Sequence, residues 1–114
     1  MTVEELVPAL GLKLIAGEPS LQREVTGGYA SDLLSCVMAR ARAGNVWVTL
    51  QAHVNVVAVA SLLDLAAVII TEGVEPDVAT RQRAEAEGVI LLSTPQTTFA
   101  VISELARLGV AAAQ

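Results

Sequence analysis

Short apolar runs alternate with longer helical patterns over the last two thirds of the chain. The runs at 46–50, 67–71 and 89–92 consist almost entirely of apolar and β-branched residues, without the alternation of a half-exposed strand. Such runs are typical of strands covered on both faces of a parallel sheet. Helices are expected between them, at 54–63 and from Pro76 to residue 87. The order strand–helix–strand therefore repeats and predicts an α/β fold.

The beginning of the chain carries its own start and stop signals. Thr2 and Glu5 have the spacing of a capping box, and Gly11 can end the helix that begins there. The apolar residues at 12–16 predict a first strand, and residues 24–26 are expected to continue in extended structure towards the glycines that follow.

Capping residues predict two further helices. Ser31 or Asp32 can cap a helix that ends near residue 42. Thr94 as a cap and Pro95 in the first turn predict the start of a last helix, which runs to about residue 108.

The whole chain has the length and composition of one domain. Its 114 residues can enclose a single core. We therefore predict a single three-layer α/β/α domain over residues 1–114, with a mostly parallel central sheet of about five short strands. The net charge of −5 and the absence of a basic cluster argue against nucleic-acid binding.

Cysteine content and hydropathy bear on where the protein acts. The single cysteine, Cys36, permits no internal disulfide and favours a cytoplasmic protein. The longest apolar run, 54–70, is interrupted by Asn55, Ser61 and Asp64, so no stretch of about 20 apolar residues exists to cross a membrane.

The predicted helix at 54–63 is apolar nearly all the way round. A helix that lies on one face of a sheet usually keeps a polar side towards water. Either this helix is enclosed within the protomer, or its outer face meets a second copy of the chain. We expect a homodimer, with an interface that includes Val54, Val57, Val59 and Leu62.

The segment Thr26-Gly27-Gly28 resembles a phosphate-binding loop. It lacks the lysine of a Walker loop, because the only lysine is Lys13, and it does not fit the Rossmann glycine pattern. Two interpretations remain: an anion site made of backbone N–H groups, or a tight turn in which glycine adopts positive φ. The tight turn is the expectation.

Polar side chains follow the predicted strands at their carboxyl ends, where ligands of open α/β sheets bind. The only histidine, His53, comes after one strand, and hydroxyl-rich helix starts come after the others. No set of residues has the spacing of a metal site, and no cofactor is expected. The candidate ligand-binding residues are Thr49, Gln51, His53, Thr71, Gly73, Ser93 and Thr94.

Four blocks in fixed order resemble the DRTGG domain family over nearly the whole chain. They are LKLIAG, LQREVTGGYASDLLS, GNVWVTLQAHVNVVAVASLLDLAAVIITEG and ILLSTPQTTF. The Asp-Arg of the family name appears here as Gln22-Arg23, and the strand-end Thr-Gly-Gly appears as Thr71-Glu72-Gly73. The Thr26–Gly28 segment is then a separate loop.

The resemblance implies a regulatory rather than a catalytic protein. The family is similar to the N-terminal domain of HPr kinase/phosphorylase, whose P-loop lies in a catalytic domain that this chain lacks. It also occurs beside CBS domains in some inorganic pyrophosphatases. These relatives imply a non-catalytic regulatory or oligomer-forming module, which binds a protein partner or a small phosphate-bearing ligand such as an adenine nucleotide.

Two alternatives stay open. The first is a small enzyme that uses His53 as an acid or base, which requires a carboxylate or hydroxyl within hydrogen-bond reach of the imidazole. The second is a purely structural dimerisation domain with no ligand.

Overall fold

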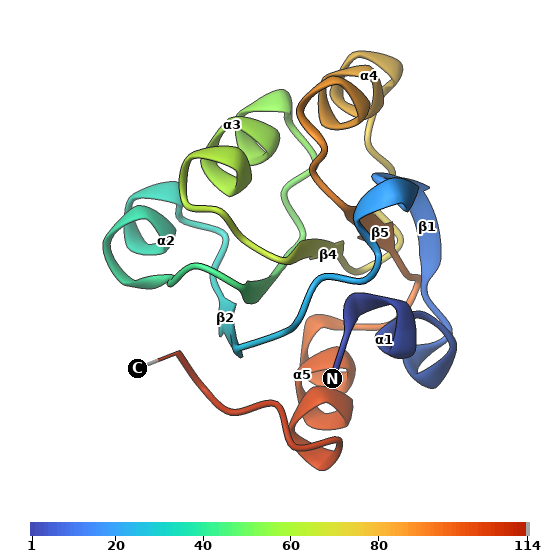
Figure 1. Cartoon of the computed structure of the whole chain (residues 1–114), viewed down its shortest axis with the longest axis vertical. Helices are drawn as coiled ribbons and strands as arrows, with labels where there is room; N and C mark the ends of the chain where they lie inside the picture. Colours follow the sequence, from blue (N-terminus) through green and yellow to red (C-terminus); the bar gives the residue numbers. More distant parts are fainter. Residues whose placement is uncertain (114) are drawn as a thin grey trace.

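A five-stranded sheet forms the centre of the molecule (Figure 1). The computed structural model describes residues 1–113. The spatial order of the strands is β1-β5-β4-β3-β2; β1 runs antiparallel to β5 and the other neighbours are parallel. The strands are β1 (Lys13–Ala16), β2 (Gly27–Ala30), β3 (Asn45–Thr49), β4 (Ala67–Ile70) and β5 (Leu91–Ser93).

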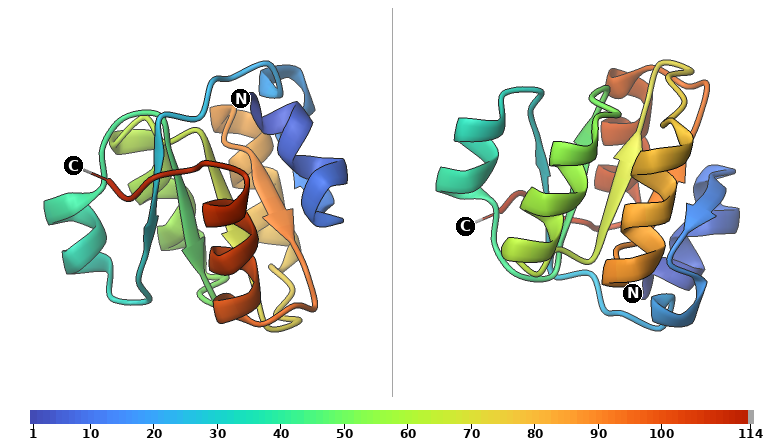
Figure 2. Two further views of the ribbon diagram at one scale, coloured as in Figure 1. Left: turned by 90° about the horizontal axis from the view of Figure 1, so that it is seen from below. Right: turned by 90° about the horizontal axis from the view of Figure 1, so that it is seen from above.

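Helices cover both faces of this sheet, which gives three layers (Figure 2). One face packs against α1 and α5, and the other packs against α2, α3 and α4. The helices are α1 (Val3–Leu10), α2 (Leu34–Arg40), α3 (Val54–Leu62), α4 (Val78–Glu87) and α5 (Thr98–Arg107), and a 3₁₀ turn, η1, spans Glu18–Ser20. The predicted α/β fold, with three layers and a mostly parallel sheet, is confirmed.

The central strands are buried on both sides, as their apolar runs predict. In β3, Val46 and Val48 face the layer of α1 and α5, whereas Trp47 belongs to the core under α2 and α3. Trp47 is fully buried, and its indole N–H donates to the carbonyl oxygen of Ser31 at 2.9 Å. It therefore fixes the end of β2 against β3.

Helix α1 begins and ends where the sequence predicts. The Thr2 hydroxyl accepts from the backbone N–H of Glu5, and the Glu5 carboxylate accepts from the backbone N–H of Thr2, which completes the capping box. Gly11 ends the helix in the left-handed conformation. Local signals are sufficient here because every partner lies within the same turn.

The predicted starts of α2 and α5 are wrong. Helix α5 begins at Thr98 with Thr97 as its cap, because the backbone N–H of Thr94 still bonds to β4 through the carbonyl of Ile70 at 3.0 Å. Helix α2 has no side-chain cap. The Asp32 carboxylate instead accepts hydrogen bonds from Thr49 and Leu50 at the end of β3.

The Thr26–Gly28 segment is not a tight turn. Gly27 and Gly28 open strand β2, and neither has a positive φ. Their small size admits the C-terminal segment, residues 110–113, which lies along this edge. The Gly28 N–H donates to the carbonyl of Ala111 at 2.8 Å, and the N–H of Ala113 donates to the carbonyl of Gly28 at 2.9 Å. A Cβ atom on Gly27 would lie 3.1 Å from the Ala111 carbonyl oxygen.

Helix α3 is half enclosed within the protomer. Val57 is fully buried in the protomer's own core, so its predicted place at a dimer interface is wrong. Val54 and Val59 are half-buried, while Leu62 is 70% exposed. Fewer apolar residues of α3 are therefore available for a dimer interface than the sequence predicts. Within residues 1–113, no helix has the length and hydropathy needed to span a membrane.

Candidate functional site

The carboxyl ends of β3, β4 and β5 lie side by side and bring the predicted hydroxyl residues together. The backbone N–H of Thr71 donates to the carbonyl of Thr49 at 3.0 Å, and Gly73 donates to the carbonyl of Thr94 at 3.1 Å. Thr49, Thr71, Ser93 and Thr94 are all buried. The structure thus places these residues at one edge of the sheet, as parallel strands require.

The buried hydroxyls mainly fasten this edge together. Thr49 Oγ1 donates to Asp32 Oδ1 at 2.8 Å, and the same carboxylate oxygen accepts from the backbone N–H of Leu50 at 2.9 Å. Thr94 Oγ1 accepts from the N–H of Gln96 at 3.2 Å. Thr49 and Thr94 thus hold neighbouring loops through hydrogen bonds within the chain.

Thr71 and Glu72 join the end of β4 to the start of α5. The hydroxyls of Thr71 and Thr98 are 2.6 Å apart. Glu72 Oε2 accepts from the backbone N–H of Thr98 at 2.8 Å, and its own N–H donates to the carbonyl of Gln96 at 2.8 Å. Glu72 adopts a φ of 63°, a left-handed conformation that glycine adopts far more readily. Glu72 thus adopts a backbone conformation typical of glycine, while its side chain caps α5.

Three of the predicted residues retain exposed groups. His53 is exposed and caps α3, because its Nδ1 accepts from the backbone N–H of Asn55 at 3.1 Å. Gln51 is half-buried and donates to the carbonyl of Asp32 at 3.1 Å. Gly73 is exposed in the turn after β4. These residues form the accessible rim above the buried hydroxyls.

The arrangement required for acid–base chemistry at His53 is not present among residues 1–113. The side-chain hydrogen bond of the imidazole is the one to the Asn55 N–H, and no carboxylate or hydroxyl of the described residues bonds to it. Within the same residues, no group of three His, Cys, Asp or Glu side chains is placed to hold a metal ion.

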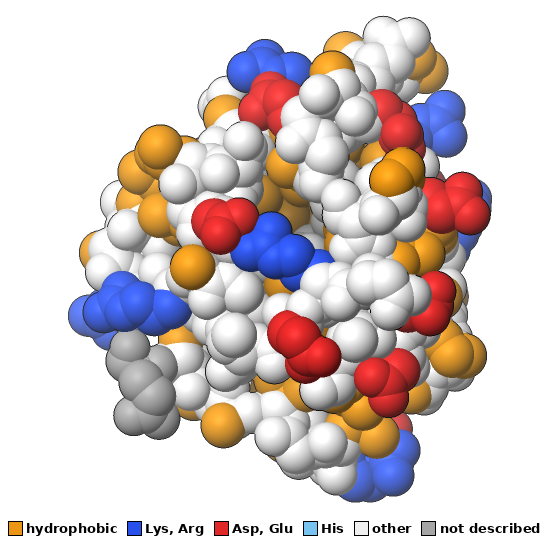
Figure 3. All heavy atoms as spheres, in the orientation of Figure 1, with side chains coloured by type: hydrophobic (Ala, Val, Ile, Leu, Met, Phe, Trp, Pro, Cys, Tyr) orange, Lys and Arg blue, Asp and Glu red, His pale blue; other side chains and the backbone are white. Residues whose placement is uncertain are grey.

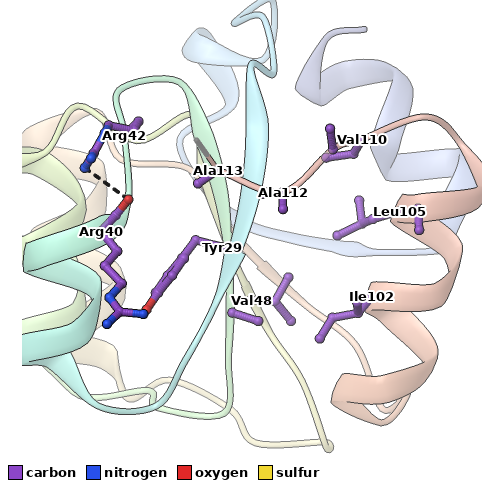
Figure 4. A pocket seen from close by; sticks show the side chains of 13 residues that line it. Tyr29, Arg40, Arg42, Val48, Ile102, Leu105, Val110, Ala112 and Ala113 are labelled. Atoms are coloured by element: carbon purple, nitrogen blue, oxygen red, sulfur yellow. Dashed lines mark hydrogen bonds between the residues drawn. The ribbon is translucent and has the colours of Figure 1, made fainter.

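A cavity that no sequence signal predicted lies along the edge strand β2 (Figure 4). Its volume is about 570 Å³, and none of the predicted ligand residues lines it. The walls come from β2, the end of α2, helix α5 and the C-terminal segment: Tyr29, Ala30, Arg40, Arg42, Val48, Ile102, Leu105 and residues 110–113 are among them. Only the return of the chain's end to β2 creates this enclosure.

The Gln22-Arg23 pair has a structural role in the loop before β2. Arg23 Nη2 donates to the carbonyl of Asp64 at 2.7 Å and forms an ion pair with its carboxylate at 2.9 Å. Asp64 has a φ of 57°, so Arg23 holds a left-handed turn before β4. Gln22 donates to Glu4 Oε1 at 2.9 Å and ties the same loop to α1.

Fold and strand-end geometry define a small α/β domain with a hydrogen-bonded region at the carboxyl ends of β3, β4 and β5. The model of the DRTGG domain matches residues 5–108, and the chain belongs to this family. No curated protein matches the chain.

The chain is similar in fold to a solved structure of a regulatory region. That structure contains the CBS and DRTGG domains of the regulatory region of Clostridium perfringens pyrophosphatase, complexed with the activator diadenosine tetraphosphate. The similarity has a TM-score of 0.77 at 12% sequence identity, and it covers 91% of this chain. At this level of identity the likeness shows the fold alone, and the chain spans 45% of the length of that structure.

Proposed function

We propose that this DRTGG domain is a non-catalytic regulatory module that acts in the cytoplasm, forms a homodimer and responds to a small phosphate-bearing ligand such as an adenine nucleotide. The observation that carries the proposal is its membership of a family with a member in the regulatory region of a nucleotide-activated pyrophosphatase. The effect of the ligand passes to a partner protein.

The strand-end rim is the proposed ligand site. Gln51, His53 and Gly73 are accessible there, above the buried Thr49, Thr71, Ser93 and Thr94. The imidazole of His53 and the amide of Gln51 can donate to phosphate oxygens, and the buried residues fix the loops that carry them.

Native mass spectrometry with a panel of adenine nucleotides tests the ligand. We expect one nucleotide per subunit or per dimer, and weaker retention in the variant His53→Asn, which keeps a side-chain acceptor for the start of α3. Gln82→Asn, on the exposed side of α4, is the control. A protein that stays bare across the panel contradicts nucleotide sensing and favours a structural dimerisation domain.

The proposed dimer uses the apolar surface of α2 and α3. Hydrophobic side chains gather over these helices in Figure 3, and Leu33, Met38 and Leu62 are 60%, 44% and 70% exposed. Large exposed apolar side chains on neighbouring helices are candidates for an interaction surface.

Substitution at Leu62 separates dimerisation from folding. We expect Leu62→Asp to give a folded monomer by light scattering, because the side chain makes little contact within the protomer. Val57→Asp should instead abolish folding, since it places a carboxylate in the core. Val78→Asp, at a position 57% exposed on α4, is the control. If the Leu62→Asp variant has the same molar mass as the wild-type protein, whether that of a monomer or of a dimer, the proposed interface is wrong.

A further inference from the structure

The cavity beside β2 has predominantly apolar walls. Val48 from β3, Ile102 and Leu105 from α5, and Val110 from the C-terminal segment line it. Figure 4 shows these side chains on one side of β2 and the Tyr29 ring with Arg40 on the other. A volume of about 570 Å³ lies within the range of small-molecule sites, which are mostly apolar with a few polar groups.

All charged side chains that line the cavity are positive. Arg40 and Arg42 contribute to the lining, and no carboxylate does. Arg42 Nη1 donates to the carbonyl oxygens of Arg40 and Ala41, at 3.1 and 3.4 Å, which orients its guanidinium. Neither arginine forms an ion pair with a carboxylate of residues 1–113. In a chain of net charge −5, this is a local positive field that favours anions.

The edge of β2 adds an open pair of backbone groups. Gly28 directs its N–H and carbonyl outwards to the C-terminal segment. Backbone groups of successive strand residues point alternately to the two sides, so Ala30 directs its N–H and carbonyl to the same outer edge. The C-terminal segment bonds to Gly28 and, within the described residues, does not reach Ala30. A donor and an acceptor therefore border the cavity.

We propose that this cavity is a binding site for a small organic anion that joins one carboxylate or phosphate group to an apolar body. The anionic group pairs with the Arg40 guanidinium beside the Tyr29 ring, and Arg42 adds to the positive field. The body passes the edge of β2 at Ala30, which supplies hydrogen bonds, and lies against Val48, Ile102 and Leu105. The site is distinct from the strand-end rim, because the two share no residue. Failure of either proposal therefore leaves the other intact.

Fluorescence titration with anilinonaphthalene sulfonate, an aromatic sulfonate, tests the site on the folded chain. We expect saturable binding to one site per chain. A charge-assisted hydrogen bond from Arg40 to the sulfonate contributes to the binding free energy, so Arg40→Gln should lower the affinity for the probe about tenfold. Arg81→Gln removes an equal charge from the exposed side of α4 and should leave the affinity unchanged.

A second pair of variants tests the apolar part by filling it. Ala106→Phe places a ring at the α5 wall and should displace the probe, whereas Ala86→Phe, at an exposed position of α4, should not. Thermal unfolding of each variant confirms that it is folded. Equal affinity in Arg40→Gln and Arg81→Gln, or absence of saturable binding, overturns the proposal.

Competition identifies the source of the anion. Displacement of the probe by decanoate indicates an acyl carboxylate, and displacement by adenosine monophosphate indicates a nucleotide. Decylammonium, with the same chain and the opposite charge, should compete at least tenfold less well than decanoate. Equal competition by decylammonium and decanoate would show that the probe binds through hydrophobic contact without selectivity for charge, which would overturn the anion site. In nitrogen-labelled protein, the amide signal of Ala30 should shift on addition of the competing anion.

Discussion

The hydroxyl groups of Thr71 and Thr98 lie 2.6 Å apart and join the carboxyl end of β4 to the first turn of α5. Thr71 is fully buried, and its hydroxyl also lies 3.4 Å from the carbonyl oxygen of Thr49. The Thr71 hydroxyl therefore connects the end of β4 both to α5 and to the end of β3.

Replacement of Thr71 separates this hydrogen bond from packing. Thr71→Val keeps the shape of the side chain and leaves Thr98 without its partner, so we expect a loss of about 1–2 kcal/mol in the free energy of unfolding. Urea denaturation measures it. Because both partners are then absent, the double variant Thr71→Val with Thr98→Val should cost no more than Thr71→Val alone. Simple addition of the two single effects would show that the hydroxyls act independently.

Glu72 occupies a backbone conformation that suits glycine, with φ of 63°. Glu72→Ala and Glu72→Gly both remove the carboxylate that caps α5, but only alanine retains the strain of a left-handed residue. The glycine variant should therefore be the more stable by about 1 kcal/mol. Comparison of urea midpoints checks this order.

The same pair of substitutions at Glu75 is the control for Glu72. Glu75 lies in the same loop and has no positive φ, so glycine there should be equal to or less stable than alanine. If alanine is favoured at both positions, residue 72 does not carry the strain inferred from its conformation.

Acid should weaken the caps of two helices. The pKa of Glu5 is held below its ordinary value of 4.5, first by the backbone N–H of Thr2 and then by the Thr2 hydroxyl. The pKa of Asp77 is lowered from 3.8, chiefly by the backbone N–H of Thr80. A carboxyl whose pKa is lower in the folded state stabilises the fold above its unfolded pKa, and this contribution disappears as the pH falls through the folded pKa.

We therefore expect the urea midpoint to decline as the pH falls below 4.5, and to decline less steeply in Glu5→Gln and Asp77→Asn. Glu75→Gln should follow the wild type, since the Glu75 carboxylate has no hydrogen bond from the described residues. Parallel curves for all four proteins would show that the caps make no contribution to acid sensitivity.

Much of the fold could be predicted because its signals are local. The strands β3, β4 and β5 are apolar on both faces, and Thr2, Glu5 and Gly88 specify helix ends through partners one turn away. The start of α5 could not be predicted in this way. Thr94 and Pro95 match a helix start, but Thr94 is retained in the sheet by Ile70, which lies far back in the sequence.

For the candidate sites too, local features could be predicted from the sequence, whereas contacts with distant residues could not. Parallel strands bring their carboxyl ends together, so the proximity of Thr49, Thr71 and Thr94 followed from the strand assignment alone. The hydrogen-bond partners of these hydroxyls could not be predicted, because Asp32 and Thr98 come from other elements. The two glycines before Tyr29 were conspicuous in the sequence, but their reason lies in residues 110–113, which return from the end of the chain.

That return also shields part of one border of the sheet from pairing with other chains. Antiparallel β1 occupies one border, and residues 110–113 occupy part of the other through their bonds to Gly28. An uncovered border strand is a template on which other chains can polymerise. Loosening of residues 110–113 would therefore show itself first as slow, concentration-dependent aggregation, while the melting temperature of the remaining fold changes little.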